Sequence, residues 1–240
     1  MNKVELRGGC YVLGGGAPIK DLFTPLIGAD FGARHLSQMA LKLDDPSPVF
    51  QFGSSDVLLF VIEGTGQAEI GGKKFGIEAR SGLYIRPGEA FQITPKSSIK
   101  ALLTICPEEP TFRVLKTMPE FFDADHPARH VGIDHDKREA MGDRFFQVLV
   151  SKGIGSENVT QFIGEIPLGK APSHHHFYEE ALYILEGEGR MWTGDKSTPV
   201  QAGSIIFLPA KQEHSLECTS EVGLKVAGHF YPAGSPAENY

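Results

Sequence analysis

Ala181-Leu-Tyr-Ile-Leu-Glu186-Gly187-Glu-Gly189 is a short apolar segment that ends in Glu-Gly-x-Gly, and Val57-Leu-Leu-Phe-Val-Ile-Glu63-Gly64-Thr-Gly66 has the same pattern 123 residues earlier. Downstream, Gly82-Leu-Tyr-Ile-Arg-Pro87 is matched by Gly203-Ser-Ile-Ile-Phe-Leu-Pro209, again a glycine, an apolar segment and a proline. Internal repetition sets the architecture of a chain, and two copies are too few for a solenoid. The repeat therefore predicts a duplicated domain.

Both copies have the pattern of an all-β fold. Short β-rich segments such as 145–150, 159–166 and 181–185 are bounded by glycine or proline, and the chain has 28 Gly and 16 Pro. Strands at this spacing predict a β-sandwich or barrel. Helical segments are expected in two places only, near 36–43 and within the polar connection 116–142.

The repeat also predicts the domain boundaries. We expect an N-terminal barrel over residues 1–118, a connection over 119–142 and a C-terminal barrel over 143–240. The connection carries an acidic, histidine-bearing stretch from Asp123 to Asp136. We interpret this stretch as a solvated linker in preference to a second metal site, because blocks of charge are usually solvated.

One segment of the second copy carries the residue types of a metal site. In Pro172-Ser-His174-His175-His176-Phe-Tyr-Glu179-Glu180, alternate residues of a strand share a face. His174, His176 and Glu180 therefore point one way, and His175 and Glu179 the other. A further histidine, His214, follows Pro209. Imidazoles and a carboxylate on one face are suitable ligands for a divalent metal.

This pattern resembles the cupin superfamily, which has two sequence motifs. The first motif is matched by Gly169, His174, His176, Glu180 and Gly187, and the second by Gly203, Pro209 and His214. Two turn positions depart from the pattern, with Lys211 in place of a glycine and Cys218 in place of an asparagine. The resemblance implies small antiparallel barrels of the jelly-roll (double-stranded β-helix) type. Because it covers both halves, the chain resembles a bicupin whose metal lies inside the C-terminal barrel.

The first copy lacks the metal ligands. Aligned on the two repeated patterns, the N-terminal counterparts of the four ligands are Gln51, Gly53, Val57 and Gln92. None of these side chains is ionisable. The N-terminal barrel is therefore predicted to bind no metal and to act as a support, a dimerisation unit or a lid; a metal-free binding pocket is the alternative.

Other residues near the motif are candidates for contact with a substrate. Tyr178 lies on the same face of the predicted strand as the ligands. Tyr178 and Glu180 are the candidate catalytic residues. Arg190 and Trp192 begin the strand after the Glu-Gly-Glu-Gly turn. If they face the cavity, the arginine would bind a carboxylate; an exterior position for the pair is the alternative. His175 is a candidate for a supporting role beside the ligands.

Three neutral imidazoles and one carboxylate would hold one divalent metal per chain, and Fe, Mn, Ni and Zn all suit the set. Octahedral coordination leaves two positions for water, substrate or O₂, so the centre supports Lewis-acid or O₂ chemistry. The resemblance to bicupins favours a dioxygenase-type oxidoreductase acting on a small organic metabolite. The alternatives are a non-enzymatic metal- or ligand-binding protein and a metal-dependent isomerase or hydrolase, for which the bicupin ureidoglycine aminohydrolase offers an architectural parallel with a different ligand pattern.

Composition excludes several other classes of function. The net charge of −7 falls entirely in residues 121–240, and no run of Lys or Arg predicts binding to nucleic acid or to an anionic membrane. The three cysteines are far apart and form neither a disulfide framework nor a CxxC pair. No signal-like or membrane-spanning stretch is evident. We therefore expect a cytoplasmic protein, a small-molecule substrate and a homodimer.

Overall fold

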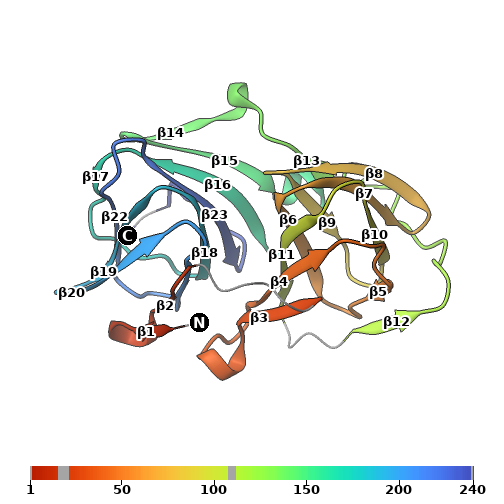
Figure 1. Ribbon diagram of the computed structural model, residues 1–240, viewed down its shortest axis with the longest axis horizontal. Coiled ribbons are helices and arrows are strands. Elements are labelled where there is room, and N and C mark those ends of the chain that lie inside the picture. The colour runs from red at the N-terminus through yellow and green to blue at the C-terminus, as the bar shows by residue number, and fades with distance from the viewer. Residues whose placement is uncertain (1, 16–21, 108–111, 239) are drawn as a thin grey trace.

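Two β-barrels lie side by side in the computed structural model, which describes residues 2–15, 22–107, 112–238 and 240 (Figure 1). Each barrel consists of two antiparallel sheets, which confirms the expected all-β fold with two tandem barrels. The helices of the described residues are four short 3₁₀ turns: η1 (Arg7–Gly9), η2 (Ala29–Phe31), η3 (His135–Lys137) and η4 (Lys152–Ile154). None of the described helices has the length and apolar character needed to cross a membrane.

The N-terminal barrel is built from a six-stranded and a five-stranded sheet. The six-stranded sheet has the order β13 (His130–Val131), β9 (Gly82–Ile85), β6 (Asp56–Glu63), β11 (Ile99–Cys106), β4 (Ser37–Leu43) and β3 (Phe23–Ile27). The five-stranded sheet has the order β12 (Arg113–Leu115), β5 (Val49–Gln51), β10 (Ala90–Pro95), β7 (Thr65–Ile70) and β8 (Lys73–Glu78).

The C-terminal barrel is built from an eight-stranded and a four-stranded sheet. The larger sheet has the order β1 (Lys3–Glu5), β2 (Tyr11–Leu13), β21 (Ile205–Leu208), β18 (Glu179–Glu186), β23 (Leu224–Tyr231), β16 (Thr160–Ile166), β15 (Arg144–Val150) and β14 (Glu139–Met141). The smaller sheet has the order β17 (Gly169–Lys170), β22 (Ser215–Cys218), β19 (Glu188–Thr193) and β20 (Lys196–Gln201).

The repeated apolar segments form strands that are buried on both faces. On β6, Val57, Leu59 and Val61 point into the core of the N-terminal barrel. Leu58 and Phe60 point the other way, into an apolar cluster shared with β18, β21 and β23 of the second barrel. Strands covered on both faces are apolar along their whole length. This explains why the repeated segments show no alternation of apolar and polar residues.

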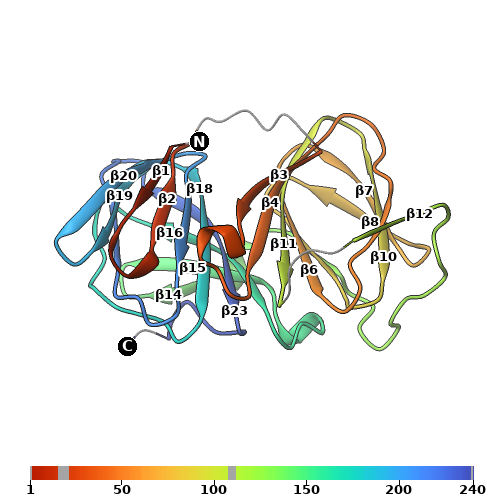
Figure 2. The same cartoon turned by 90° about the horizontal axis from the view of Figure 1, so that it is seen from below.

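The barrels exchange their edge strands, which differs from the predicted boundaries. Strand β2 pairs with β21 of the C-terminal barrel, with Tyr11 opposite Phe207, and Figure 2 shows β1 and β2 beside that barrel. Reciprocally, β13 from the 119–142 connection pairs with β9 of the N-terminal barrel. The first residues of the chain therefore belong structurally to the second barrel. Sequence similarity alone does not reveal such pairing, because the exchanged segments, β1–β2 and β13, lie outside the repeated sequence pattern. We call these two segments the exchanged arms.

The expected helix near 36–43 is wrong, whereas the connection contains one short 3₁₀ helix. Residues 37–43 form β4, which pairs with β3 and β11 and is buried along most of its length. Burial between two neighbouring strands overrides the weak local preference for helix. The connection contains β13, β14 and the three-residue turn η3, and no longer helix within the described residues.

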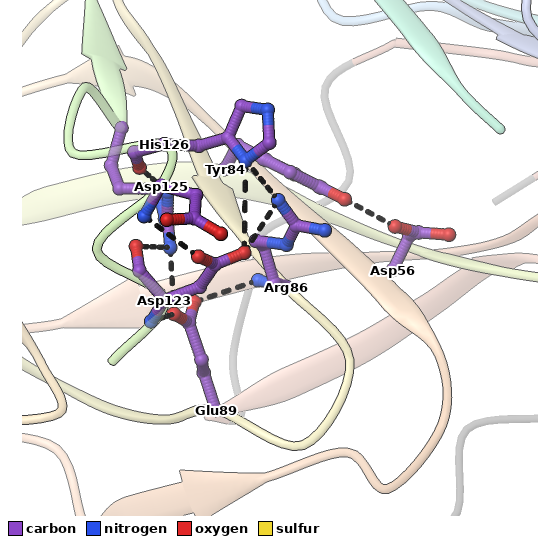
Figure 3. Close-up of polar contacts among 8 residues, drawn as sticks. Asp56, Tyr84, Arg86, Glu89, Asp123, Asp125 and His126 are labelled. Carbon is purple, nitrogen blue, oxygen red and sulfur yellow. Dashed lines mark hydrogen bonds and ion pairs between the residues drawn. The ribbon is translucent and has the colours of Figure 1, made fainter. Parts of the chain in front are cut away.

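The connection is bound to the N-terminal barrel by buried charges. The Arg129 guanidinium is fully buried and donates to Glu89 Oε1 at 2.7 Å, and it lies 4.5 Å from the Phe122 ring centre. Glu89 also accepts the backbone N–H of Asp123 at 2.9 Å, and Arg86 pairs with Asp123 at 2.7 Å (Figure 3). The acidic stretch is thus in part an ion-paired anchor, where a solvated linker was expected.

Each barrel also contacts the other through a carboxylate at the start of one strand, and these two strands, β18 and β6, are equivalent in the repeat. Glu179, the first residue of β18, is buried and accepts the backbone N–H groups of residues 34–36 at 2.7, 3.0 and 3.0 Å. Asp56, the first residue of β6, accepts the Asn158 side-chain amide at 3.0 Å. Asn158 lies 123 residues after His35. The two contacts are therefore related by the repeat.

Candidate metal centre

The four predicted ligands come from neighbouring segments of the C-terminal barrel. His174 and His176 lie between β17 and β18, Glu180 is the second residue of β18, and His214 directly precedes β22. The backbones of His174 and His214 form an antiparallel bridge, with N–H···O distances of 3.0 and 2.8 Å in the two directions. This bridge holds the two histidine-bearing loops together.

The side chains of these residues converge inside the barrel. One ring nitrogen from each of His174, His176 and His214 lies within 4.8 Å of the others. Glu180 Oε2 lies 3.8 Å from His176 Nε2 and 3.5 Å from His214 Nε2. This carboxylate oxygen is buried and has no hydrogen-bond partner. A buried oxygen without a partner is costly, and a cation between it and the imidazoles would satisfy it.

The imidazoles are oriented by backbone carbonyls. The Nδ1 atoms of His174, His176 and His214 lie 2.9, 2.8 and 2.8 Å from the carbonyl oxygens of Pro172, Glu238 and Gln212. A carbonyl only accepts, so each Nδ1 carries the proton and each Nε2 keeps a free lone pair. Carbonyl acceptors of this kind fix the tautomer and orientation of metal-binding histidines.

Burial sets the protonation states of the site. It lowers the pKa of His176 to about 4 and that of His214 to about 3, and it also lowers the pKa of His174. The histidines are therefore neutral at pH 7 and ready to bind a cation. Burial raises the pKa of Glu180 to about 8, so this carboxyl keeps its proton at pH 7 until a cation takes its place. The donor set fits a single divalent transition metal.

These pKa values predict that metal binding at pH 7 releases about one proton per ion, from Glu180, because the histidines are already neutral. At pH 9 the release should fall close to zero, and below pH 8 the affinity should fall about tenfold per pH unit. Calorimetric titration of Zn²⁺ in buffers of different ionisation enthalpy measures the proton count. Glu180→Gln should show almost no release at pH 7. Release of two or more protons at pH 7, or of none, would contradict the assignment.

The raised pKa of Glu180 also makes the folding stability of the metal-free protein depend on pH. The folded-state pKa of Glu180, about 8, lies above its ordinary value of 4.5, so the folded chain binds this proton more tightly than the unfolded chain. The proton therefore favours the folded state, and between about pH 6.5 and 8 the stability of the metal-free protein declines as the pH rises. Below pH 6.5 the histidines, whose pKa values are lowered, act in the opposite direction.

A pocket with a volume of about 70 Å³ adjoins the four ligands. Its walls are mostly apolar and include Phe146, Phe162, Leu182 and Phe230. Arg144, at the start of β15, also lines it. Sequence analysis missed this arginine; the available signal is parity, because Arg144 is two residues before the inward-facing Phe146.

The structure places Tyr178 and His175 beside the ligands. The Tyr178 ring stacks on His176 with ring centres 4.9 Å apart and planes at 12°, and its hydroxyl donates to the Ser235 carbonyl at 2.7 Å. Burial raises the pKa of this hydroxyl. Tyr178 therefore supports His176 and does not line the pocket. His175 faces Phe177 and Tyr240, away from the other three histidines.

Arg190 and Trp192 lie outside the pocket. The Arg190 guanidinium donates to Ser197 Oγ at 2.8 Å, and Trp192 Nε1 donates to Glu217 Oε2 at 2.7 Å. Both side chains alternate with Met191, which is fully buried in the barrel core. Strand parity therefore directs both side chains outward, which is the exterior position given above as the alternative.

Strand register identifies the N-terminal counterparts of the ligands. Phe91 pairs with Phe50 in the first barrel as His214 pairs with His174 in the second. The expected positions at Gln51, Gly53 and Gln92 are each displaced by one residue. The displacement of Gln51 and Gly53 arises because the first copy has one more residue between β5 and β6. Gln92 is displaced because Leu208 pairs with Glu180 as Ile85 pairs with Val57, so Pro209 corresponds to Arg86 and not to Pro87.

The positions of the four ligands are thus filled by apolar side chains in the first barrel. They are Phe50, Phe52, Val57 and Phe91, and all are buried. The rings of Phe52 and Phe91 stack with centres 6.0 Å apart. Within the described residues, the histidine group of the second barrel is the one cluster suited to hold a metal.

Comparison with known proteins places the chain among cupin folds. The Cupin domain family model matches residues 165–227, which include all four ligand positions. An uncharacterized protein of Methanocaldococcus jannaschii is 35% identical over 80 residues. That match covers 32% of this chain and 64% of the archaeal protein, so it spans just under two thirds of that relative.

Solved structures resemble the whole chain at low identity. Protein YlbA from E. coli has a TM-score of 0.70 and 17% identity, covering 98% of this chain and 96% of its own. Oxalate decarboxylase of Bacillus subtilis, studied for its Mn(II) centres, has a TM-score of 0.71 and 13% identity, covering 98% and 76%. Salicylate 1,2-dioxygenase from Pseudaminobacter salicylatoxidans has a TM-score of 0.69 and 10% identity, covering 87% and 76%. These similarities show the two-barrel cupin fold.

Proposed function

We propose that this bicupin is a metal-dependent enzyme, of the dioxygenase type, that acts on a small organic molecule at one mononuclear centre in its C-terminal barrel. His174, His176, His214 and Glu180 would hold the metal. The observation that supports this most directly is the buried, partnerless Glu180 Oε2, which faces His176 and His214 beside a mostly apolar pocket.

The proposed chemistry divides between the metal and the residues around it. When bound, a divalent metal supplies Lewis acidity and, if it is iron, reactivity toward O₂. The histidines supply neutral donors in a fixed orientation, and Glu180 supplies the one negative charge of the set. The apolar walls exclude bulk water, which strengthens electrostatic interactions at the reacting atoms. Tyr178 keeps the His176 ring in place.

Two features favour an enzyme over a storage or sensor protein. A storage site needs only the ligands, whereas this site adjoins a pocket with mostly apolar walls. Salicylate 1,2-dioxygenase, whose fold this chain shares, acts on an aromatic compound, and the aromatic wall formed by Phe162 and Phe230 is suited to such a molecule. An isomerase or hydrolase remains the second candidate, since the same ligands accept redox-inactive metals.

Metal analysis followed by O₂ consumption tests this proposal. We expect about one metal ion per chain in tag-free protein prepared without chelator. Anaerobic loading with Fe(II) should then give O₂ uptake with a member of a panel of enols and catechols, whereas the Zn(II) form should give none. O₂-independent turnover by the Zn(II) form would replace the dioxygenase with the isomerase or hydrolase. Failure to bind metal after reconstitution would overturn the metal enzyme.

A further inference from the structure

Arg144 has neither a hydrogen-bond nor an ion-pair partner among the described residues. Its Nε atom is buried and makes no hydrogen bond, and no described carboxylate lies within ion-pair distance of its guanidinium. By contrast, Arg138 pairs with Glu165 at 2.6 Å and lies over the Phe145 ring. The second acidic residue of the pocket wall, Glu165, is therefore already neutralised by Arg138.

Arg144 lies in the wall of the same pocket as the four candidate metal ligands. A divalent metal with three neutral imidazoles and one carboxylate has a net charge near +1. Together with Arg144 the pocket then holds about two positive charges, which favours an anionic ligand.

The rest of the wall requires an apolar body on that ligand. Phe162 and Phe230 are stacked with ring centres 4.7 Å apart, and Leu182 and Val226 complete a buried surface around them. Such a wall offers few partners for hydroxyl or amide groups, and an unpaired polar group there would be costly. The pocket therefore combines one cationic anchor, one metal position and an apolar surface.

We infer that Arg144 is a substrate-binding residue that anchors a carboxylate, and that the substrate is a small carboxylic acid with an apolar or aromatic body. This inference rests on the proposed function, because it names the class of molecule on which that site acts. Guanidinium groups bind carboxylates through two parallel hydrogen bonds, and the free Nε–H is one of the donors needed. Arg144 thus takes the role first assigned to Arg190.

Binding of simple carboxylates tests the inference without knowledge of the substrate. The probes are benzoate and hexanoate, each compared with its neutral amide, benzamide or hexanamide. Calorimetry would measure their affinities for the wild type, Arg144→Gln and Arg144→Lys, in the metal-free and Zn(II)-loaded forms. Arg190→Gln is the matched control, since it removes an arginine charge from the outer face of the same barrel.

We expect at least one carboxylate to bind the wild type in both forms at least tenfold more tightly than its amide. Arg144→Gln should weaken that binding about 10- to 100-fold, as for loss of charge-assisted hydrogen bonds. Arg144→Lys should recover part of the loss, and Arg190→Gln should match the wild type. Circular dichroism checks that each variant is folded.

Two results would overturn the inference: equal affinity of Arg144→Gln and the wild type for the carboxylates, or equal affinity of the wild type for acids and amides. Both are independent of the proposed metal chemistry. If the chain took up no metal, the metal-free titration would still test Arg144. If metal and O₂ uptake were established but Arg144→Gln bound carboxylates normally, the inference would fail alone.

Discussion

His176→Ala should abolish metal binding, reducing the content from about one ion per chain to a background level. His176 supplies one of three neutral nitrogen donors, is buried, and has its Nδ1 fixed by the Glu238 carbonyl. Loss of an outer hydrogen-bond partner typically costs ~10–100-fold in metal affinity, and removal of a ligand should exceed that, by ~10³-fold or more. Competition with a chromophoric chelator measures the affinity, and elemental mass spectrometry the content.

The neighbouring histidine provides the control for this experiment. His175→Ala removes an imidazole from the same segment, but that ring faces Phe177 and Tyr240 instead of the ligand cluster. It should retain the metal at wild-type affinity. Gln51→Ala in the first barrel should also leave the metal content unchanged. A folded His176→Ala protein that kept full metal content would remove His176 from the centre.

Glu89→Ala in the N-terminal barrel should produce a large loss of stability, because Glu89 is the buried partner of Arg129 in the connection. The Arg129 guanidinium has no solvent exposure, so removing Glu89 leaves a buried charge without its counter-ion. Breaking a buried ion pair from one side typically lowers the free energy of unfolding by about 3–5 kcal/mol. Glu89 also accepts the N–H groups of Arg86 and Asp123, each at 2.9 Å. Urea denaturation followed by circular dichroism measures the change.

Two further variants show whether the unpaired charge is the cause. Glu89→Leu combined with Arg129→Met leaves no buried charge and should recover much of the loss. Glu63→Ala removes an exposed partner of Lys100 and should change the free energy of unfolding by less than ~1 kcal/mol. If Glu89→Ala stayed within that smaller range, the ion pair would not anchor the connection.

The repeat made the architecture predictable because it lies in strands covered on both faces. The patterns around Glu63 and Glu186 coincide with β6 and β18, whose bounds differ by the predicted 123 residues. The exchanged arms were not predictable, since β2 and β13 have no counterpart in the repeated pattern. The expected helix at 36–43 failed because the burial that makes β4 a strand comes from residues distant in sequence.

The candidate site, like the fold, was predictable from the sequence only in part. Parity and motif spacing were sufficient to bring together His174, His176, Glu180 and His214, although only Glu180 lies in a regular strand and His174 and His176 lie in the loop between β17 and β18. Three first-barrel counterparts were misplaced by one residue. A single extra residue before β6 shifts Gln51 and Gly53, and the non-equivalence of Pro87 and Pro209 shifts Gln92. Arg144 was missed because its lack of a partner is a property of the folded pocket. From charge and residue type alone, Arg144 and Arg190 are equally good candidates for binding a substrate carboxylate.

The exchange of edge strands has an evolutionary consequence. Each barrel is completed by a segment that precedes the other one in the chain, β2 for the second and β13 for the first. Two identical single-barrel subunits that swapped their leading arms would make the same contacts twice, as Glu179 and Asp56 still do. The archaeal relative, of which 80 matched residues form 64%, has about the length of one such subunit. Gene duplication and fusion of a swapped homodimer would give this chain directly, and would leave one copy free to replace its four ligands with three phenylalanines and a valine.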